Sequence, residues 1–447
     1  MLSQEEAKRI TDKVLAFRKA DELSVALSGE RSGNIRYARN TVSTSGETNN
    51  MSLAVTAVYG KRSGTATINE FDDASLEKIV RRAEEIARLA PENPEFMAAL
   101  GPQTYLQPAS YADSTARIDP EFRAKAAFDS IDVCDKRKLT AAGFLEDGTG
   151  FSAIANSKGL FGYNRATGVD FSVTVRTADG TGSGYALRDV TNASQLNTRQ
   201  ATEVAAQKAA ASVNAKALEP GKYTVILEPA ASVDLLGNMM FNMDARAADE
   251  GRSFLSKKGG GTRLGEKLFD ERVQIYSDPM NADAPGSPWA GGGGRFGGGG
   301  GVDGRPQEKV TWVEKGVVKN LFYSRYWADK KDVKAVPGPS NIIMVGGNES
   351  IADLIKSTQK GILVTRLWYI RAVDPQTLLY TGLTRDGTFY IENGQIKFPV
   401  KNFRFNESPV IMLNNLEALG KPVRVNGNLI PPMKIRDFTF SSLSDAV

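Results

Sequence analysis

Tyr223-Thr-Val-Ile-Leu-Glu-Pro-Ala-Ala-Ser-Val-Asp-Leu-Leu-Gly-Asn-Met-Met-Phe-Asn-Met243 is the stretch that decides how the second half of this chain folds. Its first five residues have the composition of a strand. Pro229 then suits the first turn of a helix. From Val233 onward, apolar residues recur at helical spacing, and these are Leu236, Met240, Met243 and Ala247. The stretch therefore predicts a strand that runs directly into a helix.

Upstream of this stretch, a helix followed by short strands occurs twice. Ser3 and Glu6 form a capping-box pattern that opens the first helix. Strands are expected around 35–38 and 53–59, and a second helix over 75–89. After Gly101-Pro102 come a helix over 120–138, strands at 141–145, 152–156, 160–164, 169–176 and 182–187, and an Ala-rich helix over 198–215. The repeated pattern indicates two related α+β units.

The region beyond residue 310 is mostly strand-like, with one helix expected over 350–359. The glycine tract 291–304 is interpreted as a flexible loop, with a flap over a groove as the functional alternative. We therefore predict a multi-domain α+β protein, rich in antiparallel sheet with packed helices. The expected divisions are 1–105, 106–219 and a larger β-rich part, 220–447.

The chain of 447 residues contains no histidine and one cysteine, Cys134. Ser-His-Asp, Cys-His and His-zinc sites therefore cannot be assembled from it. Acidic neighbours raise the pKa of the Cys134 thiol and the nearby Lys136 and Arg137 lower it, so the lack of an activating histidine is what favours a structural role. One cysteine can form neither an internal disulfide nor a cysteine-based zinc site.

Charge and hydropathy exclude two further classes of partner. The formal net charge is +4, and the basic residues are scattered among acids, so no nucleic-acid partner is expected. No apolar stretch approaches the roughly 18 residues that a membrane span needs, and the N-terminus lacks a signal-peptide pattern. We therefore expect a soluble cytoplasmic protein without a membrane partner.

Several short segments, in their order along the chain, resemble the TldD/PmbA family, which is related to zinc metallopeptidases and is also called the modulator of DNA gyrase family. Leu227-Glu-Pro229 precedes a helix that carries Leu235-Leu236, as in that family. Further segments that resemble family signatures are 35–40, 155–160, 264–268, 273–279, 360–365 and 384–396. The resemblance covers nearly the whole chain.

In active members of the family, an HExxxH motif on this helix supplies two zinc ligands and a catalytic glutamate, and a cysteine nearer the C-terminus can complete the zinc site. The resemblance places Gly237, Asn238 and Asn242 at the motif positions of this chain. Neither glycine nor asparagine replaces an imidazole ligand. We therefore expect no zinc, no other cofactor and no hydrolysis by the family mechanism.

Two further sets of polar residues on or near this helix have competing interpretations. Asp244, Asp249 and Glu250 offer oxygen ligands to a hard cation, although solvated acids on a polar helix face are favoured. Asn238 and Asn242 lie four residues apart, where they can hydrogen-bond a peptide or a partner. The alternative for both asparagines is an ordinary polar surface.

Arg325, Tyr326 and Trp327 are candidates for a peptide groove, with buried packing as the alternative for the two aromatic residues. By resemblance, motif-lacking members pair with active ones, and the complex cleaves unfolded or modified peptides in an internal cavity. The chain is then expected in a homodimer, or in a heterodimer with an HExxxH-bearing paralogue, as a non-catalytic subunit. The alternatives are a hydrolase with an unrecognised site and a stand-alone peptide-binding assembly protein.

Overall fold

A six-stranded antiparallel sheet lies at the centre of the N-terminal half, with strand order β3-β2-β1-β4-β5-β6. The computed structural model describes residues 1–291 and 303–444. The strands of this sheet are β1 (Glu22–Ala38), β2 (Thr41–Tyr59), β3 (Arg62–Ile68), β4 (Thr140–Asn156), β5 (Phe161–Arg176) and β6 (Ser183–Val190).

Each half of this sheet carries its own pair of helices. The first three strands are flanked in sequence by α1 (Gln4–Ala16) and α2 (Asp73–Leu89), and the last three by α4 (Pro120–Lys136) and α5 (Thr198–Ala211). Short α3 (Asp113–Ala116) precedes α4, and the 3-10 turn η1 (Ala193–Gln195) precedes α5. The repeated helix-and-meander pattern is thus present, and both copies share one sheet because β1 pairs with β4 along its length.

The strands are much longer than the sequence alone predicts. The segments expected at 141–145 and 152–156 are one strand, β4, and those at 160–164 and 169–176 are one strand, β5. The intervening Gly-rich and polar residues have weak strand propensity. They remain in the sheet because β4 pairs on both sides, with β1 and with β5, so neighbouring strands satisfy their backbone groups.

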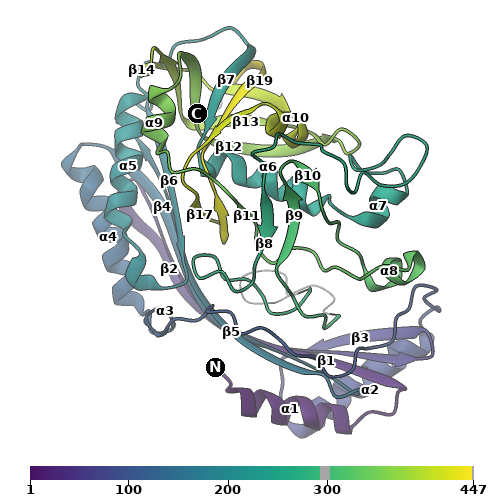
Figure 1. Ribbon diagram of the computed structural model, residues 1–447. Coiled ribbons are helices and arrows are strands. Elements are labelled where there is room, and N and C mark those ends of the chain that lie inside the picture. The colour runs from purple at the N-terminus through teal and green to yellow at the C-terminus, as the bar shows by residue number, and fades with distance from the viewer. Residues whose placement is uncertain (292–302, 445–447) are drawn as a thin grey trace.

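The four long helices all cover the same face of the sheet. Alternate residues of β1 on that face are buried, and they include Leu23, Val25, Leu27, Ile35 and Tyr37. Figure 1 shows the sheet curving around the C-terminal part of the chain, with these helices on its outer side. The inner side of the sheet is thereby left to the C-terminal elements.

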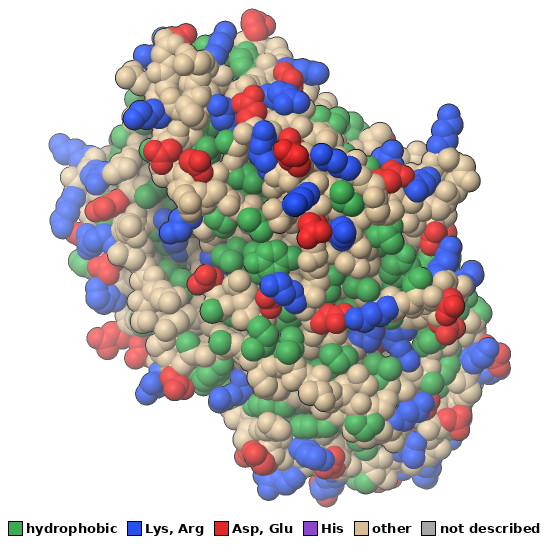
Figure 2. Space-filling model, viewed as in Figure 1, with side chains coloured by type: hydrophobic (Ala, Val, Ile, Leu, Met, Phe, Trp, Pro, Cys, Tyr) green, Lys and Arg blue, Asp and Glu red, His purple; other side chains and the backbone are tan. Residues whose placement is uncertain are grey.

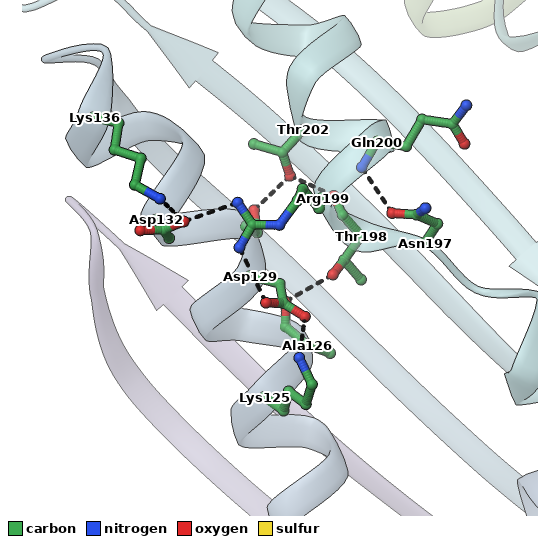
Figure 3. Close-up of polar contacts among 11 residues, drawn as sticks. Lys125, Ala126, Asp129, Asp132, Lys136, Asn197, Thr198, Arg199, Gln200 and Thr202 are labelled. Carbon is green, nitrogen blue, oxygen red and sulfur yellow. Dashed lines mark hydrogen bonds and ion pairs between the residues drawn. The ribbon is translucent and has the colours of Figure 1, made fainter.

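Helices α4 and α5 are joined by Arg199, as Figure 3 shows. Its guanidinium donates to Asp132 at 2.8 Å and to Asp129 at 3.2 Å. Thr198 Oγ1 adds a hydrogen bond of 2.9 Å to the carbonyl of Ala126.

The surface on the face shown in Figure 2 is a mixture of basic and acidic side chains.

A ring of strands forms the centre of the C-terminal half. The strands β12, β7, β19, β15 and β13 pair in that order, and an additional β12–β13 pairing closes the ring. Their bounds are β7 (Gly221–Leu227), β12 (Lys360–Asp374), β13 (Leu379–Glu392), β15 (Phe403–Glu407) and β19 (Met433–Leu443), with β14 (Gln395–Pro399) and β16 (Leu416–Leu419) attached.

A second C-terminal sheet consists of short strands in the order β10-β9-β8-β11-β18-β17. They are β8 (Ile275–Ser277), β9 (Val310–Glu314), β10 (Val317–Val318), β11 (Ile343–Met344), β17 (Val423–Val425) and β18 (Asn428–Ile430). The helices of this half are α6 (Pro229–Phe241), α7 (Ala245–Asp249), α8 (Arg325–Lys331), α9 (Ile351–Lys356) and α10 (Pro409–Asn414). The α+β class expected from the sequence is therefore confirmed.

Local predictions in the N-terminal half agree with the structure in two places. Ser3 and Glu6 form the expected capping box of α1. Cys134 is fully buried in α4, and burial raises the pKa of its thiol to about 11, with a smaller contribution from Asp135 that Arg137 opposes.

Most of the predicted glycine loop, residues 292–302, lies outside the described residues. No helix in the described ranges is both long and apolar enough to cross a membrane.

Candidate functional site

Strand β7 leads directly into α6, as the sequence predicts. The end of β7 is buried between β12, which runs parallel to it, and β19, which runs antiparallel. Glu228 is the N-cap residue of α6, and Pro229 occupies the first turn. The helix therefore starts at a fixed point on the ring of strands.

Most of α6 is buried in the main C-terminal core. The buried residues include Leu235, Leu236, Met239 and Met240, and Met243 just after the helix is buried as well. The methionines thus fill the core. The helix ends at Phe241 rather than continuing to Ala247, because Met243 and Ala245 exchange backbone hydrogen bonds with Phe322.

The remaining face of α6 is open. Asp234 and Phe241 are exposed, and Gly237 and Asn238 are half-buried between them. The Asp234 carboxyl keeps access to water, yet desolvation by the surrounding protein raises its pKa. An added Cβ at Gly237 meets no atom of the described residues within 4 Å, so a side chain has room at the first position of the degenerate motif.

Asn242, at the last motif position, is used by the fold. It is the C-cap residue of α6, and its amide donates to the carbonyl of Asn238 at 2.8 Å and to the hydroxyl of Tyr380 at 3.4 Å. Burial raises the pKa of that tyrosine, and the Asn242 hydrogen bond opposes the shift. The Asn238 side chain has no hydrogen bond within the described residues and is half-buried beside Gly237.

These residues do not fit a zinc ion. Zinc in proteins takes imidazole, thiolate or carboxylate ligands, whereas Gly237 has no side chain and Asn238 and Asn242 carry only carboxamides. The one thiol, Cys134, is buried among the helices of the N-terminal half. Among residues 1–291 and 303–444, no three Asp, Glu or Cys side chains are grouped where they could hold a metal ion.

The three acidic residues beyond α6 already have partners. Asp244 caps α7 by accepting from Ala247 N at 2.6 Å. Asp249 accepts from the indole of Trp327 at 2.8 Å and forms an ion pair with a lysine of α8. Glu250 pairs with Arg246 at 2.9 Å and with a second arginine. They act as a helix cap and as ion-pair partners rather than as free oxygen ligands.

The predicted groove residues open helix α8. Trp327 is buried and Tyr326 is half-buried against the C-terminal core, which is the packing alternative for aromatic residues. Arg325 donates to the carbonyl of Ala98 at 2.8 Å, and burial lowers its pKa. The role of these three residues in binding peptide stays a prediction.

A cavity of about 870 Å³ lies at the start of α6, between the N-terminal sheet and the C-terminal half. Figure 1 shows the elements that surround it, β6, α5, β17 and the first turn of α6. Two ion pairs line it and join the halves. Lys208 of α5 donates to both carboxylate oxygens of Glu228 at 2.7 Å, and Arg424 of β17 donates to Asp189 of β6 at 2.7 Å.

Nothing local in the sequence marks this cavity. Its charged residues come from β6, α5, the start of α6, a loop and β17, and they form no motif; they are Arg188, Asp189, Lys208, Glu228, Asp283 and Arg424. The strand and helix patterns around 182–187 and 198–215 could have shown that β6 and α5 are neighbours. The docking of both against α6 follows only from the tertiary structure.

Comparison with known proteins agrees with this architecture. Three family descriptions match in order along the chain: PmbA/TldA metallopeptidase domain 1 over residues 23–87, the central domain over 111–215 and the C-terminal domain over 220–442. A search of curated protein sequences finds no match.

Three solved structures share the fold at low sequence identity. A protein from Thermotoga maritima, titled as a modulator of a DNA gyrase, has 17% identity and a TM-score of 0.86, covering 97% of this chain and all of its own. A similarly titled protein from Bacteroides thetaiotaomicron has 20% identity and a TM-score of 0.83, covering 99% and 100%. TldE from Thermococcus kodakarensis has 16% identity and a TM-score of 0.85, covering 97% and 99%.

The fold and the matched domains define an α+β protein related to metallopeptidases. The chain belongs to the PmbA/TldD family.

Proposed function

We propose that this chain is a catalytically inactive PmbA/TldD-family subunit that contributes to a peptide-binding chamber in a dimeric cytoplasmic protease complex. One observation carries the proposal. Helix α6 is folded and anchored in the core, yet the motif positions carry Gly237, Asn238 and Asn242, of which the last is committed to the C-cap. The helix that carries the zinc motif in the family is retained, and the side chains that would bind zinc are absent from its motif positions.

The partner in this proposal is either a second copy or a paralogue that bears HExxxH. The paralogue supplies the zinc, the metal-bound water and the glutamate that takes its proton, which is the chemistry of such sites. This chain supplies part of the chamber wall and contacts to an extended peptide. Unfolded peptides can add to an exposed strand edge through main-chain hydrogen bonds.

The direct test measures zinc and proteolysis for the chain alone and with the paralogue. We expect no stoichiometric zinc and no chelator-sensitive cleavage of an unfolded protein by the chain alone, and cleavage when the paralogue is present. The matched control is the paralogue with its motif glutamate changed to glutamine, which should remove the activity of the pair. Stoichiometric zinc together with chelator-sensitive proteolysis by the chain alone would refute the proposal.

The alternative is a peptide-binding assembly protein without a protease partner. Co-purification separates the two possibilities, because only the first predicts a stable complex with a histidine-bearing paralogue.

A further inference from the structure

The cavity at the start of α6 runs along a free strand edge. Strand β6 is the last strand of its sheet and, among the described strands, pairs with β5 alone, without any shift in register. Consecutive residues from Tyr185 to Asn192 line the cavity, as expected where the edge of a strand faces it. Main-chain groups of an edge strand are available to another extended chain.

The direction of these main-chain groups follows from Ser183. Its N–H and its carbonyl lie 2.8 and 2.9 Å from the hydroxyl of Ser212, so both point away from β5. Because antiparallel pairing repeats every two residues, Tyr185, Leu187 and Asp189 also direct their main-chain groups away from β5. The carbonyl of Leu187 accepts from the Arg188 guanidinium at 2.7 Å, which agrees with this direction.

One cation in the cavity lacks an acidic partner. Lys208 is paired with Glu228 and Arg424 with Asp189, whereas Arg188 forms no ion pair within the described residues. Desolvation lowers the pKa of Arg188, and the nearby Glu228 opposes the shift only in part. Arg188 is nevertheless an exposed residue, so its guanidinium keeps donors open to water and to an anion, which would stabilise it.

Two further groups at the cavity lack partners. Ala230, in the first turn of α6, has no hydrogen bond to its N–H in the described residues, and Glu228 forms no side-chain cap there. The start of a helix favours negative charge. The carboxylate of Asp189 is fully buried, and its Oδ1 has no hydrogen-bond partner there, so it can accept from a ligand N–H.

We propose that this cavity binds the carboxyl-terminal end of an extended peptide. The peptide adds to the free edge of β6, and its terminal carboxylate lies against Arg188 and the first turn of α6. The site rests on the proposed function, because it assigns a substrate class to the same chamber wall. Capture of a chain end by a strand edge and main-chain donors is an established mode of peptide recognition.

Charge and size favour this ligand over a phosphate. The lining carries three cations and three acids. Lys208 pairs with Glu228 and Arg424 with Asp189, which leaves Arg188 and the exposed Asp283 outside these ion pairs, so a monoanion fits this balanced wall better than a dianion. The volume of about 870 Å³ is within the range of small-ligand pockets. Apolar residues such as Leu187, Val204 and Val423 line the remaining wall and suit short aliphatic side chains.

The test uses the full chain and two labelled pentapeptides of alanine and serine, one with a free C-terminal carboxylate and one with a C-terminal amide. Fluorescence anisotropy should show the free acid binding about tenfold tighter or more, as expected when one charge-assisted contact is lost. Arg188→Gln should remove most of that difference, and Arg188→Lys should restore part of it. Acetate should displace the free acid at least as well as inorganic phosphate does.

The matched control is Arg82→Gln, which changes an exposed arginine on α2 far along the chain. Its affinities should equal those of the parent chain. Equal binding of acid and amide, equal effects of the two glutamine variants, or stronger displacement by phosphate would overturn the carboxylate site. Peptide binding that does not depend on Arg188 would leave the proposed function standing, whereas no binding of either peptide would also count against the chamber.

Discussion

The ion pair between Lys208 and Glu228 is expected to hold the N-terminal sheet against the start of α6. Both oxygens of Glu228 lie 2.7 Å from Lys208 Nζ, and the side chains are 14% and 16% exposed, respectively. A double-mutant cycle with Lys208→Met, Glu228→Gln and the double variant isolates the energy of this contact.

The expected coupling follows from the geometry. At 2.7 Å and an effective dielectric constant near 20, Coulomb attraction is about 6 kcal/mol. Desolvation and side-chain ordering offset much of it. Exposed pairs retain about 0.2–1 kcal/mol. For this nearly buried, doubly bonded pair we expect a net coupling of about 2 kcal/mol.

Urea unfolding is the appropriate assay, followed by tryptophan fluorescence and by far-ultraviolet circular dichroism. The four tryptophans are residues 289, 312, 327 and 368, so fluorescence reports on the C-terminal half and, through the contact of Trp289 with Tyr105, on its packing against the N-terminal half, while dichroism reports on the whole chain. The coupling should decrease only slightly between 0.1 and 0.5 M salt, because a buried pair is weakly screened. A coupling energy below about 0.5 kcal/mol would refute the view that this pair joins the two halves.

Three further predictions concern the pH dependence, the degenerate motif and the cysteine. Glu84 is 2% exposed; burial alone would raise its pKa, but the N–H of Lys19, the Arg81 guanidinium and the N–H of Ala20 outweigh burial and lower it. The stabilisation that Glu84 contributes is therefore complete above the unfolded pKa of about 4.3 and is lost as pH falls through the lower folded pKa. Glu84→Gln should cost about 1.5–3 kcal/mol at pH 7, and the cost should decrease steadily in urea melts as the pH is lowered below about 4. The triple variant G237H/N238E/N242H should retain zinc after dialysis, measured by elemental analysis, while the parent chain does not; equal retention by both would contradict the motif assignment. Cys134, with a pKa of about 11, is about 0.1% thiolate at pH 8 and should react with a disulfide reagent only after unfolding; rapid reaction of the folded chain would contradict its burial.

Local signals in the sequence determined local structure well. The capping box at Ser3, the strand that ends at Leu227 and the helix that starts at Pro229 all lie where their residues predict them. These features depend on caps, proline and apolar periodicity, whose effects extend over one or two turns. The complete lack of histidine likewise excluded whole classes of catalytic site without any structure.

Strand length and helix ends depended on partners distant in sequence. Glycine and polar residues such as Gly148 and Gly150 continue β4 only because β1 and β5 lie on both sides of it. Helix α6 stops before Ala247 because the backbone at Phe322 takes over its hydrogen bonds. Local propensity cannot include such contacts, so prediction from the sequence yields shorter strands and a longer helix than the structure has.

The sequence by itself determined which chemistry the chain lacks and, through a succession of short segments, the family to which it belongs. Only the tertiary structure decided which polar groups remain unused. Asn242 is committed to the end of its helix, whereas Arg188 has no acidic partner among the described residues, where Lys208 and Arg424 take the carboxylates of Glu228 and Asp189. Whether a side chain is free depends on what the rest of the fold places beside it, and that is a property of the packed chain.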